Sequence, residues 1–118
     1  MREAEFVVSP DEDWMRAFGA YPEMVGDDYV HEVRPTIVEG VEVVISWDPV
    51  GRSVRFVYRD DAGGPLVELF SENVHRIAVH HNPGFAEVEV HVGLDGAYGV
   101  TKFRLLPTTR IINLLVRA

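Results

Sequence analysis

The stretch Val74–Val92, VHRIAVHHNPGFAEVEVHV, decides the fold because it specifies a turn and the pairing on both sides of it. Pro83-Gly84 lies between two alternating runs, and this dipeptide is a strong turn signal. A loop of two or four residues brings apolar residues opposite apolar ones. A three-residue loop would instead place Val79 against Glu87 and mix both faces. The stretch therefore predicts an antiparallel hairpin with an even-length loop.

The register of this hairpin predicts two chemically different faces, because successive side chains of a strand point to opposite sides. The predicted pairs are His80 with Glu87, Val79 with Val88, Ala78 with Glu89, Ile77 with Val90 and Arg76 with His91. One face then holds Ile77, Val79, Val88 and Val90. The other face holds Arg76, His80, Glu87, Glu89 and His91. The hairpin should contribute a dry side to a core and present a charged side to solvent or to another molecule.

Length and composition are those of one globular domain, residues 1–118. The chain is 47% hydrophobic and 25% charged, which excludes a disordered protein, and a domain of this size buries a substantial core. No apolar run approaches the ~18 residues of a membrane span. The start, MREAEFVVSP, lacks the apolar region of a signal peptide. Without cysteine, disulfides and thiolate chemistry are excluded, and a cytoplasmic location is the simplest interpretation.

The net charge restricts the kind of partner. Nineteen acidic and eleven basic residues give a net charge of −8. This charge repels nucleic acid, whose binding requires basic surface, and it would steer a basic protein inward. An acidic excess of this size also simply keeps proteins soluble. We therefore expect a protein partner, no nucleic acid and no membrane.

A helix is predicted near the N-terminus. Ser9 can cap it, Pro10 suits the first helical position, and Glu12 can bond back to the cap. Trp14, Ala17, Phe18 and Tyr21 then recur at helical spacing and should lie against a sheet. We expect a helical segment over residues 1–28 and an antiparallel sheet over residues 29–118.

The alternating run of residues 41–48 predicts a strand, and Asp48-Pro49-Val50-Gly51 is typical of a type I turn. A two-residue loop pairs Ile45 with Val54, Val43 with Phe56 and Val41 with Tyr58. A three-residue loop with a Gly bulge shifts that register by one residue. The sequence leaves both registers open.

Further strands are predicted over residues 66–70, 98–106 and 110–117. Apolar residues of Arg110–Arg117 fall on both faces, which indicates a central buried strand or, less well, a short helix. No helical crossover follows residue 35, so the sheet should be antiparallel. The predicted class is α+β: an amphipathic helix packed on an antiparallel meander of about six or seven strands, or a half-open barrel around that helix. If Leu66–Phe70 or Arg110–Arg117 is an exposed edge, it favours a homodimer through strand pairing.

Some residues resemble parts of known catalytic or metal sites, but the resemblance is not specific. Glu87 and Glu89 lie roughly 7 Å apart on one strand face, near the carboxyl spacing of inverting glycosidases, but any strand with alternating acids gives this spacing. His80, His81 and His91 are metal-ligand types, yet His80 and His81 point to opposite faces. No nucleophile motif and no phosphate-binding loop is present. We expect no enzyme activity, no metal and no cofactor.

Two functional hypotheses remain. The first is a protein-binding module, because a mixed-charge β surface with Arg residues is typical of interfaces, although cross-strand ion pairing alone explains such a surface. The predicted contact residues are Glu68, Glu72, Arg76, His80, Glu87, Glu89 and His91. The second is a small ligand-binding or catalytic β-barrel, lined by Trp47, Phe56, Tyr58 and Phe103. The second fails if Trp14 and Phe18 fill that space.

A family resemblance favours the first hypothesis. The order of Trp14, Phe18-Gly19-Ala20-Tyr21-Pro22 and the acidic-His segment Asp27–Val33, followed by Val67–Ile77 and the strands of Gly99–Val116, resembles small bacterial immunity proteins of polymorphic toxin systems, particularly immunity protein family fifty. The resemblance covers most of the chain. It implies a non-enzymatic intracellular protein that binds and blocks a cognate toxin domain. An acidic inhibitor would suit a basic toxin.

Overall fold

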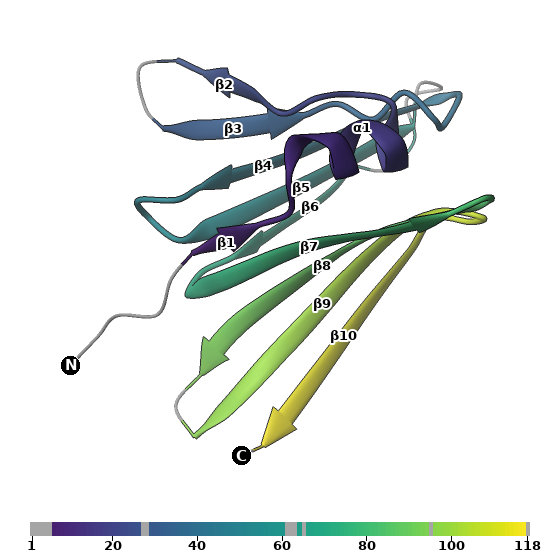
Figure 1. Cartoon of the computed structure of the whole chain (residues 1–118). Helices are drawn as coiled ribbons and strands as arrows, with labels where there is room; N and C mark the ends of the chain where they lie inside the picture. The colour runs from purple at the N-terminus through teal and green to yellow at the C-terminus, as the bar shows by residue number, and fades with distance from the viewer. Residues whose placement is uncertain (1–5, 27–28, 61–63, 65, 95, 118) are drawn as a thin grey trace.

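The computed structural model describes residues 6–26, 29–60, 64, 66–94 and 96–117, in which ten strands form two five-stranded sheets beside one helix (Figure 1). The helix is α1 (Asp11–Phe18). The N-terminal sheet has the order β2 (Glu23–Val25), β3 (Val30–Val33), β4 (Val41–Asp48), β5 (Ser53–Asp60) and β6 (Leu66–Ser71). The C-terminal sheet has the order β1 (Val7–Val8), β7 (Val74–Asn82), β8 (Phe85–Leu94), β9 (Ala97–Leu106) and β10 (Arg110–Arg117). No helix among the described residues is long and apolar enough to span a bilayer.

The predicted central hairpin is confirmed as β7–β8, pair by pair. All five predicted pairs are present, from Arg76 with His91 to His80 with Glu87. The strands pair up to Asn82 and Phe85, so the loop has two residues and Gly84 takes a φ of 80°, a conformation that glycine adopts without steric cost. The predicted apolar face is buried. The hairpin therefore supplies one wall of the core.

The prediction of a single meander of six or seven strands was wrong, because the strands divide into two layers. Both layers bury one face in the space between them, where the rings of Phe56 (β5) and Phe103 (β9) stack at 4.3 Å. The count was low because β1, β2 and β3 are too short to show a period. β1 also pairs parallel to β7, so the C-terminal sheet is not wholly antiparallel. The N-terminal segment, expected to be helical, therefore holds strands as well as α1.

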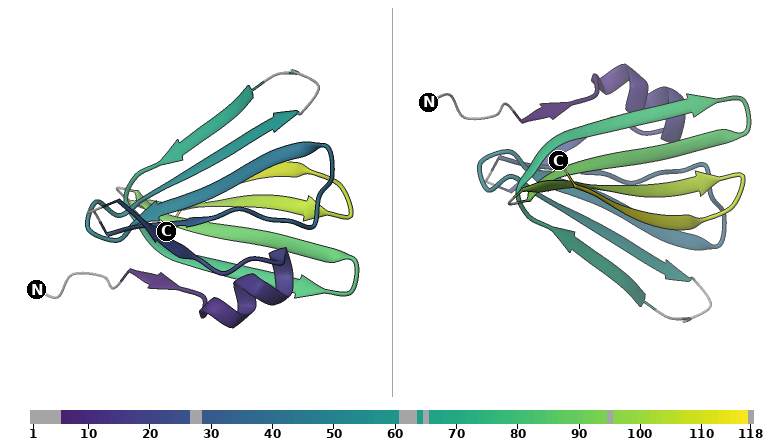
Figure 2. Two further views of the ribbon diagram at one scale, coloured as in Figure 1. Left: turned by 90° about the horizontal axis from the view of Figure 1, so that it is seen from above. Right: turned by 90° about the horizontal axis from the view of Figure 1, so that it is seen from below.

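Helix α1 lies beside β7 at one side of the two layers (Figures 1 and 2). Trp14, Ala17 and Phe18 are buried as predicted, whereas Tyr21 lies beyond the helix and is 45% exposed. The helix ends at Phe18 because Gly19 takes a φ of 73°, which terminates helices readily. Its N-cap is Pro10, without a side-chain cap.

Ser9 does not cap α1 as predicted but ties the start of the helix to the central hairpin. Its Oγ accepts the N–H of Val79 at 2.9 Å, and its carbonyl accepts the Trp14 indole N–H at 3.1 Å. The backbone N–H of Ser9 donates to Ile77 at 3.0 Å. Ser9 therefore bonds to the backbone of β7 instead of capping the helix, because β7 presents a donor and an acceptor next to it.

The aromatic pocket expected of a ligand-binding barrel is filled by the core. Trp14 stacks on Trp47 at 4.8 Å, and Trp14 and Phe18 are fully buried. Phe56 and Phe103 stack on each other, as described above, and only Tyr58 among the predicted lining residues is partly exposed. Because Trp14 and Phe18 of the helix fill this space, the predicted aromatic-lined pocket is absent among the described residues.

The hairpin β4–β5 adopts neither of the two registers left open. Ile45 pairs with Phe56 and Trp47 with Val54, which leaves a four-residue loop from Pro49 to Arg52. Arg52 takes the positive φ, at 53°. The shift from the two-residue register is two residues, so the apolar face is conserved although every partner changes.

The prediction that Arg110–Arg117 is a central buried strand was wrong. β10 pairs only with β9 and forms the edge of its sheet. Leu114 and Leu115, on opposite faces, are 49% and 63% exposed. An apolar run on both faces therefore identified a strand, but not its place in the sheet.

Replacing Trp14 by Ala should lower the free energy of unfolding by about 3–5 kcal/mol, because it removes a fully buried indole and its stacking on Trp47. Arg16→Ala, on the exposed side of the same helix, should change it by less than about 0.5 kcal/mol. Urea unfolding followed by circular dichroism measures both. Equal losses would contradict the packing of α1 described here.

Candidate functional site

The outward side of the C-terminal sheet carries a cluster of ionisable residues from β7, β8 and β9, which we call the charged face. It consists of Arg76, His80, Glu87, Glu89, His91, Lys102 and Arg104. The pleat places them there, since each is one position away from a buried residue such as Ile77, Val88 or Phe103. The β8–β9 register sets Glu87 opposite Arg104 and Glu89 opposite Lys102.

Glu87 is the most buried member of the charged face, only 4% exposed. Arg104 satisfies it with a hydrogen bond of 2.9 Å from Nε to Oε2. The Arg104 guanidinium also lies 5.0 Å from the Phe85 ring centroid, a cation–π distance. Glu87 therefore acts on the surface mainly through the orientation of Arg104, because its own carboxylate has little contact with solvent.

Glu89 joins two imidazoles across the hairpin. His91 Nε2 lies 2.6 Å from one carboxylate oxygen, and His80 Nε2 lies 3.2 Å from the other. Both oxygens are therefore occupied by groups of the same face. His80 is about half exposed, whereas Glu89 and His91 are mostly covered. His80 is thus the member of this triad that another molecule reaches first.

His75 extends the cluster toward the β7 bulge, where the register shifts between Val74 and Arg76. Its ring centroid lies 6.0 Å from that of His91. Burial lowers the pKa of His75 below its ordinary value, and the charges of His91, Arg52 and Arg76 lower it further. This environment therefore disfavours protonation of His75.

The predicted contact residues do not form one patch. Five of them, Arg76, His80, Glu87, Glu89 and His91, meet on the charged face. Glu68 instead lies on the outward side of the N-terminal sheet, where it pairs with Arg55 at 3.2 Å. Glu72 is exposed in the connection between β6 and β7.

Sequence reasoning missed Arg104 and Lys102 as neighbours of the two glutamates. Their alternation with Phe103 placed them on a strand face, but the sequence analysis did not pair this strand with the preceding one. In the structure the β8–β9 register runs without a shift from the Leu94–Ala97 pair to the Glu87–Arg104 pair, and the bulge between Ala86 and Glu87 lies beyond these pairs. The Asp-Gly dipeptide that follows Leu94 in the sequence is a hairpin signal that could have given these partners.

Acidic charge is concentrated away from the charged face. Residues 11–48 contain ten acidic and two basic residues, a net charge of −8, while the rest of the chain contains nine of each. Asp27 and Asp28 of this acidic segment lie outside the described residues. The charged face has three Arg or Lys residues against two Glu residues. The acidic excess of the chain therefore lies outside the charged face.

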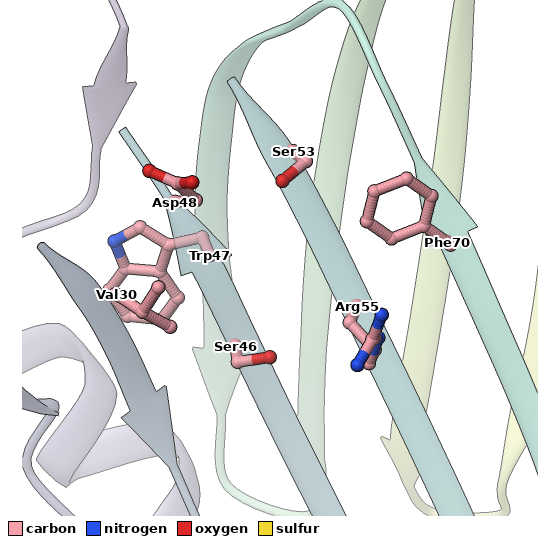
Figure 3. Close-up of a pocket in the computed structure, with 7 residues that line it drawn as sticks. All are labelled: Val30, Ser46, Trp47, Asp48, Ser53, Arg55 and Phe70. Atoms are coloured by element: carbon pink, nitrogen blue, oxygen red, sulfur yellow. The ribbon is translucent and has the colours of Figure 1, made fainter. Parts of the chain in front are cut away.

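Two surface hollows are present among the described residues. One, of about 190 Å³, lies on the outward side of the N-terminal sheet (Figure 3) and is lined by Val30, Ser46, Trp47, Asp48, Ser53, Arg55 and Phe70. The other, of about 330 Å³, lies between the start of α1 and the end of β4 and is lined by Phe6, Val8, Ser9, Pro10, Asp11, His31, Trp47 and Pro49. Neither includes a predicted contact residue.

The chemistry of the charged face is that of a paired surface. Its two carboxylates are taken up by Arg104 and by two imidazoles, as described above, and cross-strand pairing of this kind orders the side chains. Among the described residues, no group of three His, Asp or Glu side chains is arranged to hold a metal ion. The arrangement offers another protein a preorganised set of donors and acceptors.

Comparisons with known proteins give one clear likeness. No protein-family model matches the sequence, and no curated protein matches it. Among solved structures, a chain of the "Contact-dependent growth inhibition toxin - immunity protein complex from Klebsiella pneumoniae 342" matches with a TM-score of 0.77. The match covers 97% of this chain and all of that chain, at 11% sequence identity. This chain therefore shares its fold with a component of a toxin–immunity protein complex.

The Glu87–Arg104 ion pair should contribute more to the free energy of unfolding than the more exposed Glu68–Arg55 pair. Glu87→Gln should lower the free energy of unfolding by about 1–3 kcal/mol, because it weakens the buried partner of an arginine. Glu68→Gln, in a half-exposed pair, should cost less than about 1 kcal/mol. Urea unfolding of both variants tests the difference, and a larger loss at Glu68 would refute it.

The lowered pKa of His75 should make the protein less stable in mild acid. Because the unfolded chain takes up this proton at a higher pH than the native chain, stability falls as the pH is lowered through the ordinary His pKa of about 6.5. His75→Gln should reduce this loss. NMR titration of the imidazole and urea unfolding at pH values above and below the ordinary His pKa measure the effect. A His75 pKa at or above the ordinary value would contradict it.

Proposed function

We propose that this chain is an immunity protein that binds a cognate toxin domain and neutralises it by contact, without catalysis. The observation that carries the proposal is the fold shared with a component of a toxin–immunity protein complex over 97% of the chain. The sequence resemblance to immunity proteins of polymorphic toxin systems supports the immunity role rather than the toxin role. Such a protein acts in the cytoplasm, where its toxin would act.

The charge distribution supports a basic partner. The whole net charge of −8 arises within residues 11–48, so a positively charged domain is attracted toward that part of the chain. Interactions of this kind act over about 10 Å at 0.1 M salt and weaken as salt is added. Steering by the acidic segment and contact by the charged face are then separate contributions to binding.

The contact surface that we propose is the charged face with its neighbours. Arg76 and His80 are exposed and Glu89 and His91 are partly covered, whereas Glu87 contributes by holding Arg104. Glu68 and Glu72 were predicted as further contacts and would be reached only by a partner that extends past β6. Paired side chains lose little conformational freedom on binding, which favours affinity.

The test of the function is neutralisation. Tagged protein is used to recover its partner from host lysate at low and high salt, and the recovered polypeptide is expressed alone in a bacterium. We expect expression to arrest growth, and coexpression of this chain to restore it. Tight binding that depends on salt should accompany the rescue.

Two results would overturn the proposal. A recovered polypeptide that does not arrest growth is not a toxin. A toxic polypeptide whose arrest persists beside equal amounts of this chain is not its cognate toxin. Trp14→Ala, which weakens the core, is the control, because rescue that depends on the folded surface should fail in a destabilised variant.

Arg76→Ala should weaken binding of the toxin domain about tenfold or more if the charged face is the contact surface, because interface arginines often dominate affinity. Arg59→Ala removes the same charge from the outward side of the N-terminal sheet and should leave affinity within about twofold. Both residues are exposed strand residues, so long-range charge effects are matched. Calorimetry measures both variants, and equal effects would move the contact surface elsewhere.

A further inference from the structure

Among the residues that the structure describes, no strand pairs with the second edge of β10. All eight of its residues pair with β9 on one side, and β10 is the last strand in the order of the C-terminal sheet. Figure 1 shows it as the outermost strand of that sheet, running down to the C-terminus. A row of backbone donors and acceptors therefore points away from the sheet and is available to another strand.

The sequence of β10 lacks the features that protect edge strands. Charged residues, proline and short length are the usual devices. Between Arg110 and Arg117 the chain reads IINLLV, with neither charge nor proline. The edge strand of the other sheet differs, since β6 carries Glu68 in its middle, and β2 has only three residues.

Both faces of β10 carry apolar side chains, and Asn113 lies between Ile111 and Leu115 on the side toward the N-terminal sheet. Ile112 and Leu114 share the outward side, and Ile111 and Leu115 share the side toward the N-terminal sheet. Ile111 packs against the core, but Leu115 is 63% exposed. The two sheets diverge toward this end of the strand (Figure 1), so the N-terminal sheet does not cover it. Leu114 and Leu115 thus remain accessible beside the free edge.

We propose that β10 pairs antiparallel with β10 of a second copy, in a symmetric homodimer centred on Asn113. The segment Ile111-Ile112-Asn113-Leu114-Leu115 is symmetric in its apolar positions about Asn113. A two-fold axis at Asn113 sets Ile112 opposite Leu114 of the second copy, and Ile111 opposite its Leu115. These four apolar positions then meet on matching sides of one continuous sheet, and the two copies of Asn113 face each other at the axis.

Charge permits this approach of two copies. The acidic segment of residues 11–48 lies on α1 and the N-terminal sheet, and no acidic residue follows Asp95. The pairing also keeps the two Arg110 residues at opposite ends of the joined strands. The dimer leaves the centre of the charged face, on β7 and β8, open to a different partner. The inference does not depend on the immunity function.

Sedimentation of the purified full chain tests the dimer. The mass should rise from 13.3 kDa toward twice that value as the concentration increases. Leu114→Lys should abolish this rise, because it buries a charge in the interface. Leu66→Lys is the matched control: it lies on the edge strand β6 and is 48% exposed, against 49% for Leu114, and it should leave the dimer intact. A chain that stays monomeric, or a dimer that survives Leu114→Lys, overturns the proposal.

Single cysteines test the register, since the chain has none of its own. Asn113→Cys should form an intermolecular disulfide under mild oxidation, because the two-fold axis brings the two copies of this position within the 4.4–6.8 Å that disulfides require. Leu115→Cys should not, since its two copies would stand about 13 Å apart. The reverse pattern, or the absence of a disulfide in both variants, refutes a dimer centred on Asn113. Because this readout is covalent, it remains informative if Leu114→Lys is poorly folded.

Discussion

Burial of the apolar face of the β7–β8 hairpin is the constraint on which the rest of the structure depends. Ile77, Val88 and Val90 are fully removed from solvent, and a sheet face of this kind must be covered by a second layer. The N-terminal sheet packs on the same side of the C-terminal sheet, where Phe56 stacks on Phe103 of the neighbouring strand β9, and α1 packs against β7 and β8. Ser9 joins the helix to the hairpin by hydrogen bonds, so these layers are held in one arrangement.

The charged face is the other consequence of the same alternation. Each buried residue of β7, β8 and β9 forces its neighbours outward, and many of those neighbours, such as Arg76, Glu87 and Lys102, are ionisable. They bind one another, as Arg104 binds Glu87 and two imidazoles bind Glu89. Such internal pairing orders these side chains in advance. The acidic excess lies elsewhere, in residues 11–48.

The edges of the two sheets differ in how they are protected. β6 carries a glutamate and β2 is short, but β10 is long, uncharged in its interior and apolar on both sides. Natural sheets rarely leave such an edge open. A second copy of the chain satisfies its backbone groups and covers Leu114 and Leu115 without using the centre of the charged face. Self-association and binding of a different protein are therefore compatible.

The sequence by itself determined the features that depend on local periodicity. The register and both faces of the β7–β8 hairpin follow from alternation around Pro83-Gly84, and the buried side of α1 follows from helical spacing. Only the tertiary structure decided which strands share a sheet and that β10 lies at an edge. The physical reason is that alternation specifies which side of a strand is buried. The neighbour of a strand depends on bulges, loop lengths and packing between distant segments, which no short stretch encodes.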